Sequence, residues 1–211
     1  TASLANVTFE TYVDDAAGWV KLLALDKRFS SITIAGHSEG ALNGTNVAER
    51  LPVHAHVLLE GAGRPAPVVL REQLKPKLPP ALFVQSDAVI AQLQAGHTVA
   101  NPPPELSALF RPSVQPYLIS WFKYDPAAEL AKVRVPVTIV QGTADIQVNM
   151  TDAQALKHAL PGAKLAVIDG MNHMLKYYPD HSTLQAAMKG YEDPSLPVDA
   201  KVVAAVENAA R

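Results

Sequence analysis

Apolar residues follow two different spacings along this chain, and each spacing predicts a different element. They recur every three or four positions over residues 9–29, which predicts an amphipathic helix. Short runs rich in Val, Ile and Leu predict buried strands, at residues 32–35, 55–59, 135–141 and 164–169. Helix-compatible segments lie at 41–51, 151–160 and 198–211. A strand, helix, strand order is typical of a parallel sheet, so the fold class is α/β.

The strand pattern is interrupted between residues 64 and 131. Eleven prolines fall in this stretch, and its helical pieces include residues 88–94 and 129–132. We expect a helical cap, or lid, inserted into a core made of residues 1–63 and 132–211. Five apolar residues of the cap are expected either to line a cavity or simply to pack the lid: Leu118, Ile119, Trp121, Phe122 and Tyr124.

A Gly-x-Ser-x-Gly turn, residues 36–40, joins the first predicted strand to the helix after it. A sharp turn of this kind leaves the Ser38 hydroxyl exposed, and a Cβ at Gly36 or Gly40 is expected to clash as the backbone folds back. The backbone N–H of Glu39 lies beside the hydroxyl at the start of the helix. The motif therefore predicts a nucleophile, Ser38, and one oxyanion donor, Glu39.

A serine nucleophile needs a histidine to take its proton and a carboxylate to orient that histidine. Asp145 and His173 each follow a predicted strand, at the carboxyl edge where α/β sheets place functional groups. Asp145 also suits a turn or a helix cap. Asp169, at the end of the last strand, is the main rival acid. The other histidines have weaker positions, and the His37 side chain is expected to point away from the nucleophile.

Composition narrows the class of protein. A chain of 211 residues with 48% hydrophobic content can bury one substantial core. The net charge of −2, without a basic stripe, argues against nucleic-acid binding. The absence of Cys excludes disulfides and thiolate chemistry, and no metal or cofactor is expected. No apolar run approaches the ~20 residues of a membrane span, and residues 1–20 lack a signal-peptide pattern, so we expect a soluble chain of undetermined compartment, cytoplasmic or exported.

The three loops, in the order Ser38, Asp145, His173, resemble those of the α/β-hydrolase superfamily. The resemblance implies a mostly parallel sheet flanked by helices, with a cap whose form varies among members. It also implies a catalytic triad: Ser38 as nucleophile, His173 as general base and then acid, and Asp145 as the orienting carboxylate. The Glu39 N–H would supply half of the oxyanion hole, and no cofactor would be needed.

The chain departs from that family before the serine turn. Members usually carry several more strands there, and a loop after one of them supplies the second oxyanion N–H. Only part of the usual sheet is therefore expected. We interpret the chain as a fragment of a longer hydrolase, or as one whose sheet is completed by another polypeptide or by self-association.

The resemblance implies hydrolysis of small carboxylic esters through an acyl-enzyme. A peptidase or thioesterase would use the same triad, and cofactor-independent perhydrolysis is a further alternative. A hypothesis of a different class is a catalytically silent hydrolase-like module, which binds a ligand or a partner through its open sheet edge.

Overall fold

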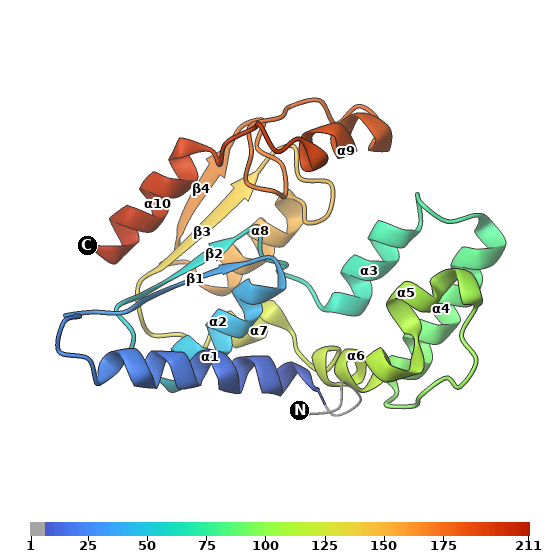
Figure 1. Cartoon of the computed structure of the whole chain (residues 1–211), viewed down its shortest axis with the longest axis horizontal. Coiled ribbons are helices and arrows are strands. Elements are labelled where there is room, and N and C mark those ends of the chain that lie inside the picture. The colour runs from blue at the N-terminus through green and yellow to red at the C-terminus, as the bar shows by residue number, and fades with distance from the viewer. Residues whose placement is uncertain (1–6) are drawn as a thin grey trace. The chain divides into compact units, whose positions relative to one another are not determined.

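A four-stranded parallel sheet organises the larger part of the chain (Figure 1). The computed structural model describes residues 7–211. The strands are β1 (Thr33–His37), β2 (Ala55–Leu59), β3 (Val137–Gly142) and β4 (Lys164–Ile168), and they lie in the order β1-β2-β3-β4. The registers pair Thr33 with Ala55, His56 with Val137 and Thr138 with Lys164. The predicted strands and the α/β class are confirmed, with shifts of one or two residues at several strand ends.

Helices cover both faces of this sheet, which explains why every residue of β2 is buried. The helices α2 (Glu39–Arg50) and α8 (Met150–Ala159) connect successive parallel strands. The helix α10 (Ala200–Ala210) packs Val202 against Val57 and Val140 on the other face. The predicted helices at 41–51, 151–160 and 198–211 are therefore present. Within residues 7–211, β1 and β4 each pair along one side only.

The described chain divides into two compact units. The sheet unit comprises residues 15–64 and 126–211, and it includes α7 (Pro126–Leu130) and α9 (Leu184–Glu192). The helical unit comprises residues 7–14 and 65–125. The predicted first helix forms α1 (Phe9–Ala24), whose opening turns belong to the helical unit. None of the helices within residues 7–211 has both the length and the apolarity needed to cross a membrane.

The helical unit has an apolar core of its own. Its elements after α1 are α3 (Ala66–Leu74), α4 (Pro80–Gln94), a 3₁₀ turn (Pro104–Leu106), α5 (Ser107–Phe110), a second 3₁₀ turn (Pro112–Val114) and α6 (Gln115–Trp121). Leu118 and Phe122 are buried in that core together with Ile90 and Phe110. Both side chains thus pack the helices of the unit together.

A buried histidine ties α2 to the sheet. His56 in β2 is 0% exposed, and its Nε2 lies 3.1 Å from the Thr45 hydroxyl and 3.2 Å from the Ala41 carbonyl oxygen. Its Nδ1 lies 3.3 Å from the Ile34 carbonyl oxygen. Burial lowers the pKa of His56 to about 4, which keeps the imidazole neutral at ordinary pH.

Candidate active site

Ser38 lies in a strained turn between β1 and α2. Its φ of 55° and ψ of −120° place a non-glycine residue in a sparsely populated backbone region. A Cβ at Gly36 would lie 2.1 Å from the Gly40 carbonyl oxygen, so the turn requires glycine at position 36. The same expectation for Gly40 is wrong, because a Cβ there meets no atom within 4 Å.

Glu39 is the first residue of α2, so its backbone N–H lies in the first turn of a twelve-residue helix. The first N–H groups of a helix have no partner within the helix, and they carry the positive end of its dipole. The turn therefore places a hydroxyl and the positive end of α2 next to each other. This is the arrangement that the Gly-x-Ser-x-Gly motif predicts.

Asp145 follows β3 and uses both of its carboxylate oxygens. The Oδ1 accepts hydrogen bonds from the backbone N–H groups of Gln147 (2.7 Å) and Val148 (3.0 Å), which shape the loop. The Oδ2 faces His173. Asp145 therefore does both things that its position suggested. Its Oδ1 stabilises a turn, and its Oδ2 contacts the imidazole of His173.

The loop that carries His173 is held by hydrogen bonds to the chain around it. The Asn172 Oδ1 accepts from the backbone N–H groups of Met174 (3.0 Å) and Lys176 (3.2 Å). The Ala144 N–H donates to the Met171 carbonyl oxygen (3.0 Å), which joins this loop to the loop of Asp145. His173 itself is only 5% exposed. These hydrogen bonds hold the loop in place, and the loop in turn fixes the position of the His173 imidazole.

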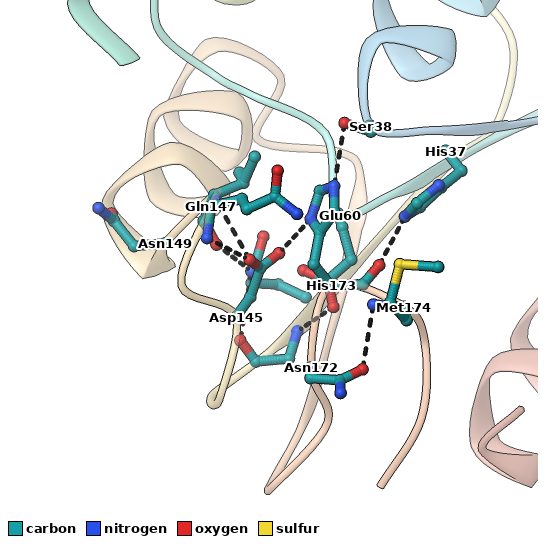
Figure 2. A network of polar contacts seen from close by, with 12 residues as sticks. His37, Ser38, Glu60, Asp145, Gln147, Asn149, Asn172, His173 and Met174 are labelled. Atoms are coloured by element: carbon teal, nitrogen blue, oxygen red, sulfur yellow. Dashed lines mark hydrogen bonds and ion pairs between the residues drawn. The ribbon is translucent and has the colours of Figure 1, made fainter. Parts of the chain in front are cut away.

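Ser38, His173 and Asp145 form one continuous chain of hydrogen bonds (Figure 2). His173 Nδ1–H donates to Asp145 Oδ2 at 2.7 Å. Because that bond uses the ring proton of the neutral imidazole, Nε2 is the acceptor for the Ser38 hydroxyl at 3.1 Å. All three residues belong to the sheet unit. The structure thus brings the three predicted side chains together.

The rival acid, Asp169, lies elsewhere. Its Oδ1 accepts a hydrogen bond from the Thr143 hydroxyl at 2.9 Å, and the residue is exposed. The Thr143 hydroxyl oxygen in turn accepts from the Gly170 N–H at 2.9 Å. Asp169 therefore helps to connect the loop after β3, which carries Asp145, to the start of the loop that carries His173. The carboxylate that contacts the imidazole is that of Asp145.

The His37 side chain contacts the loop that carries His173. Its Nε2–H donates to the His173 backbone carbonyl oxygen at 2.7 Å, and the two imidazole ring centroids lie 4.8 Å apart. Burial lowers the pKa of His37, so the ring is neutral and carries its proton on Nε2. The side chain therefore turns toward the histidine loop, although it makes no contact with the hydroxyl in this network.

Sequence reasoning missed Glu60, which directly follows β2. The residue has a φ of 50° and is 0% exposed. Its Oε1 accepts a hydrogen bond from the Gly142 N–H at 2.8 Å. Burial, and then the charge of the neighbouring Asp145, raise the pKa of Glu60 to about 10. The position after a strand, which singled out Asp145, was the available signal for Glu60 as well.

Metal ligation has no support in the part of the chain that the structure describes. No group of three or more His, Asp and Glu side chains there has a geometry that would hold a metal ion. The groups that converge on Ser38 are instead an imidazole, a carboxylate and a helix N-terminus. Such a set can activate a hydroxyl and stabilise a developing oxyanion.

Two kinds of comparison relate this chain to known proteins. Esterase EstD from Thermotoga maritima is 28% identical over 191 residues, which cover 86% of this chain and 44% of the relative. The chain thus spans less than half the length of that curated relative. Among solved structures, a monoacylglycerol lipase from Paleococcus ferrophilus gives a TM-score of 0.57 at 18% identity, covering 97% of this chain and 76% of the lipase. The structure of Est1E from Butyrivibrio proteoclasticus gives a TM-score of 0.54 at 16% identity. The match covers 88% of this chain and 71% of Est1E.

The two solved structures share the fold with this chain. At sequence identities of 18% and 16%, the likeness concerns the fold alone. A family model supplies the assignment. The model described as "Alpha/beta hydrolase family" matches residues 2–182, which is most of the chain. With its parallel sheet, serine turn and two following loops, this chain belongs to the alpha/beta hydrolase family.

Proposed function

We propose that this chain is the catalytic part of a serine hydrolase that cleaves carboxylic esters through an acyl-enzyme. The observation that carries the proposal is the hydrogen-bond chain from Ser38 Oγ through His173 to Asp145 Oδ2, with distances of 3.1 Å and 2.7 Å. The family, and an esterase among the relatives, support hydrolysis in general. The triad supports the particular mechanism.

In the acylation step, Ser38 Oγ attacks the ester carbonyl carbon while its proton passes to His173 Nε2. Asp145 holds the imidazole in the required tautomer and stabilises the imidazolium. The backbone N–H of Glu39 donates to the oxyanion of the tetrahedral intermediate. The C–O bond to the alcohol then breaks, and His173 gives its proton to the departing oxygen. The products are an alcohol and an ester of Ser38.

In the deacylation step, water attacks the Ser38 ester with His173 again as general base. The acid leaves, and the proton returns from His173 to the Ser38 oxygen. The loss of one oxyanion donor costs roughly 10²–10³ in turnover, so a single N–H from Glu39 supports only part of the rate of a complete site. We propose that additional strands pair with the open edge of β1 and bring the second donor, either from a longer form of this chain or from a partner.

We propose that residues 65–125 of the helical unit, within the cap predicted at 64–131, act as the cap over the substrate. Its own apolar core supports this role, because a lid must hold its shape while it moves. A small ester with an apolar acyl or aryl group is the substrate class that such a cap favours. A thioester or an amide would use the same triad with a different leaving group.

A series of p-nitrophenyl esters from acetate to octanoate tests the proposal, with matched thioester and p-nitroanilide substrates in parallel. We expect ester hydrolysis that disappears in Ser38→Ala, and weaker or no cleavage of the anilide. Ester turnover that persists unchanged in Ser38→Ala would contradict the mechanism. A folded protein that cleaves none of these substrates would favour the second candidate, a silent binding module, which the unpaired edge of β1 supports.

A further inference from the structure

Glu60 is a carboxylic acid in a place that does not suit a carboxylate. The residue is 0% exposed, and its Oε1 is occupied by the Gly142 N–H. Within residues 7–211, no hydrogen-bond donor reaches Oε2, which is buried from solvent. An ionised carboxylate would leave that oxygen without a donor, which is costly in a buried position. A protonated carboxyl instead needs an acceptor.

Asp145 supplies an acceptor of this kind. A carboxylate has about four lone-pair sites, and Asp145 uses three of them, for the N–H groups of Gln147 and Val148 and for His173 Nδ1–H. Two of these bonds reach Oδ1, so the remaining lone pair is on Oδ2, the oxygen that binds the imidazole. Asp145 is also the charged neighbour that disfavours ionisation of Glu60. Asp145 Oδ2 can therefore accept one more hydrogen bond, and Glu60 is the neighbouring acid that can donate it.

Given the triad roles proposed above, we infer that Glu60 is a positioning residue for Asp145. Its neutral carboxyl donates the Oε2 proton to Asp145 Oδ2 and accepts from the Gly142 N–H at Oε1. The shared proton keeps Asp145 ionised and in place as the acceptor for His173, and Glu60 touches neither the substrate nor the hydroxyl. The left-handed φ of 50° at Glu60 directs a residue at the end of β2 into this position.

Two variants of Glu60 distinguish the effect of losing its hydrogen-bond donor from the effect of changing the size of its side chain. Glu60→Gln keeps an amide N–H for Asp145 and a carbonyl oxygen for Gly142. Glu60→Met has a similar length and no donor. We expect Glu60→Met to lower kcat by about 10- to 100-fold with KM changed less than about threefold, which is the loss for one donor to a charged acceptor. Glu60→Gln should recover most of that loss. Thermal melting checks that both variants fold.

The dependence of turnover on pH gives a second test, because a purely structural role of Glu60 would not change it. Ionisation of Glu60 near pH 10 would put two adjacent anions beside His173, so wild-type turnover should fall there, and this fall should be absent in Glu60→Gln. The other titratable groups around Asp145 are His173, His37 and Tyr191. Burial lowers the pKa of His37, and burial followed by the Asp145 charge raises the pKa of Tyr191 to about 12, so neither coincides with this step.

Carboxyl ¹³C NMR of protein labelled at Glu tests the inference without any activity, with the Glu60 signal assigned from Glu60→Gln. We expect a protonated carboxyl from pH 6 to pH 9. An ionised Glu60 at pH 7, a Gln variant as impaired as the Met variant, or a fully active Met variant would each overturn the inference. If the wild type hydrolyses no ester, the proposed function fails instead, and the ¹³C signal still decides the state of Glu60.

Discussion

His37 Nε2–H donates a 2.7 Å hydrogen bond to the backbone carbonyl oxygen of His173, which joins the turn that carries Ser38 to the loop that carries His173. The two residues are 136 positions apart in the chain. The bond acts on the backbone of the His173 loop, so it fixes where the imidazole is held and leaves both ring nitrogens of His173 to Ser38 and Asp145.

Replacement of His37 should therefore reduce turnover without unfolding the protein. We expect His37→Phe, which keeps a ring and removes the donor, to lower kcat by about 3- to 10-fold, the equivalent of one neutral hydrogen bond. His37→Gln keeps an N–H donor and should lose less. Steady-state kinetics with a p-nitrophenyl ester measure both. Equal kcat for His37→Phe and the wild type would show that the bond does not position the base.

The serine turn offers a matched pair of glycine substitutions. Gly36→Ala places a Cβ 2.1 Å from a backbone oxygen that cannot easily move, whereas Gly40→Ala meets no atom within 4 Å. We expect Gly36→Ala to lower the free energy of unfolding by about 3 kcal/mol or more, as overpacking against backbone does. Gly40→Ala should be neutral, or stabilising by up to about 1 kcal/mol through helix propensity. Urea denaturation of the two variants checks this, and similar midpoints would contradict it.

The two candidate acids give a second matched pair. Asp145→Asn removes the anion that faces His173 and favours the wrong imidazole tautomer, so kcat should fall by roughly 10³- to 10⁴-fold. Asp169→Asn alters an exposed contact with the Thr143 hydroxyl and should keep kcat within about threefold. Ester hydrolysis by the purified variants measures both. The reverse order of effects would make Asp169 the functional acid.

The sequence predicted the strands because each is a compact apolar run, and the two central strands, β2 and β3, are buried almost throughout. It located Ser38, Asp145 and His173 because all three follow strand ends, where position in the chain determines position in space. The sequence analysis did not predict α9 (Leu184–Glu192), although its apolar residues Leu184, Ala187, Met188 and Tyr191 recur at helical spacing over its nine residues. The helical piece predicted at residues 129–132 overlaps α7 (Pro126–Leu130), which begins earlier and belongs to the sheet unit.

The contacts that the sequence did not reveal at the site join segments that lie far apart in the chain. Glu60 and the backbone of Gly142 are 82 residues apart, and only the pairing of β2 with β3 brings them together. The direction of the His37 ring likewise depends on where the histidine loop lies. Local sequence patterns do not predict such contacts, because tertiary packing determines the positions of both partners. Ser38, His173 and Asp145 were therefore easier to predict than the residues that support them.

Acid should weaken the sheet unit through His56. Its pKa is about 4 in the folded chain and about 6.5 when unfolded, so the unfolded state binds the extra proton more readily. The stabilisation is fully present above about pH 6.5 and falls as the pH drops toward 4, by up to about 3 kcal/mol. Urea midpoints between pH 7 and pH 4 measure this. His56→Gln should flatten the dependence, and His158→Gln, at an exposed position, should leave it unchanged. An unchanged slope in His56→Gln would contradict the assignment.

If Ser38 is an activated nucleophile as proposed, it should react with a fluorophosphonate, and intact-mass spectrometry detects the product. We expect one covalent adduct on the folded chain, located at Ser38, absent in Ser38→Ala and formed far more slowly in Asp145→Asn. A folded protein that forms no adduct, or an adduct that persists in Ser38→Ala, would contradict it.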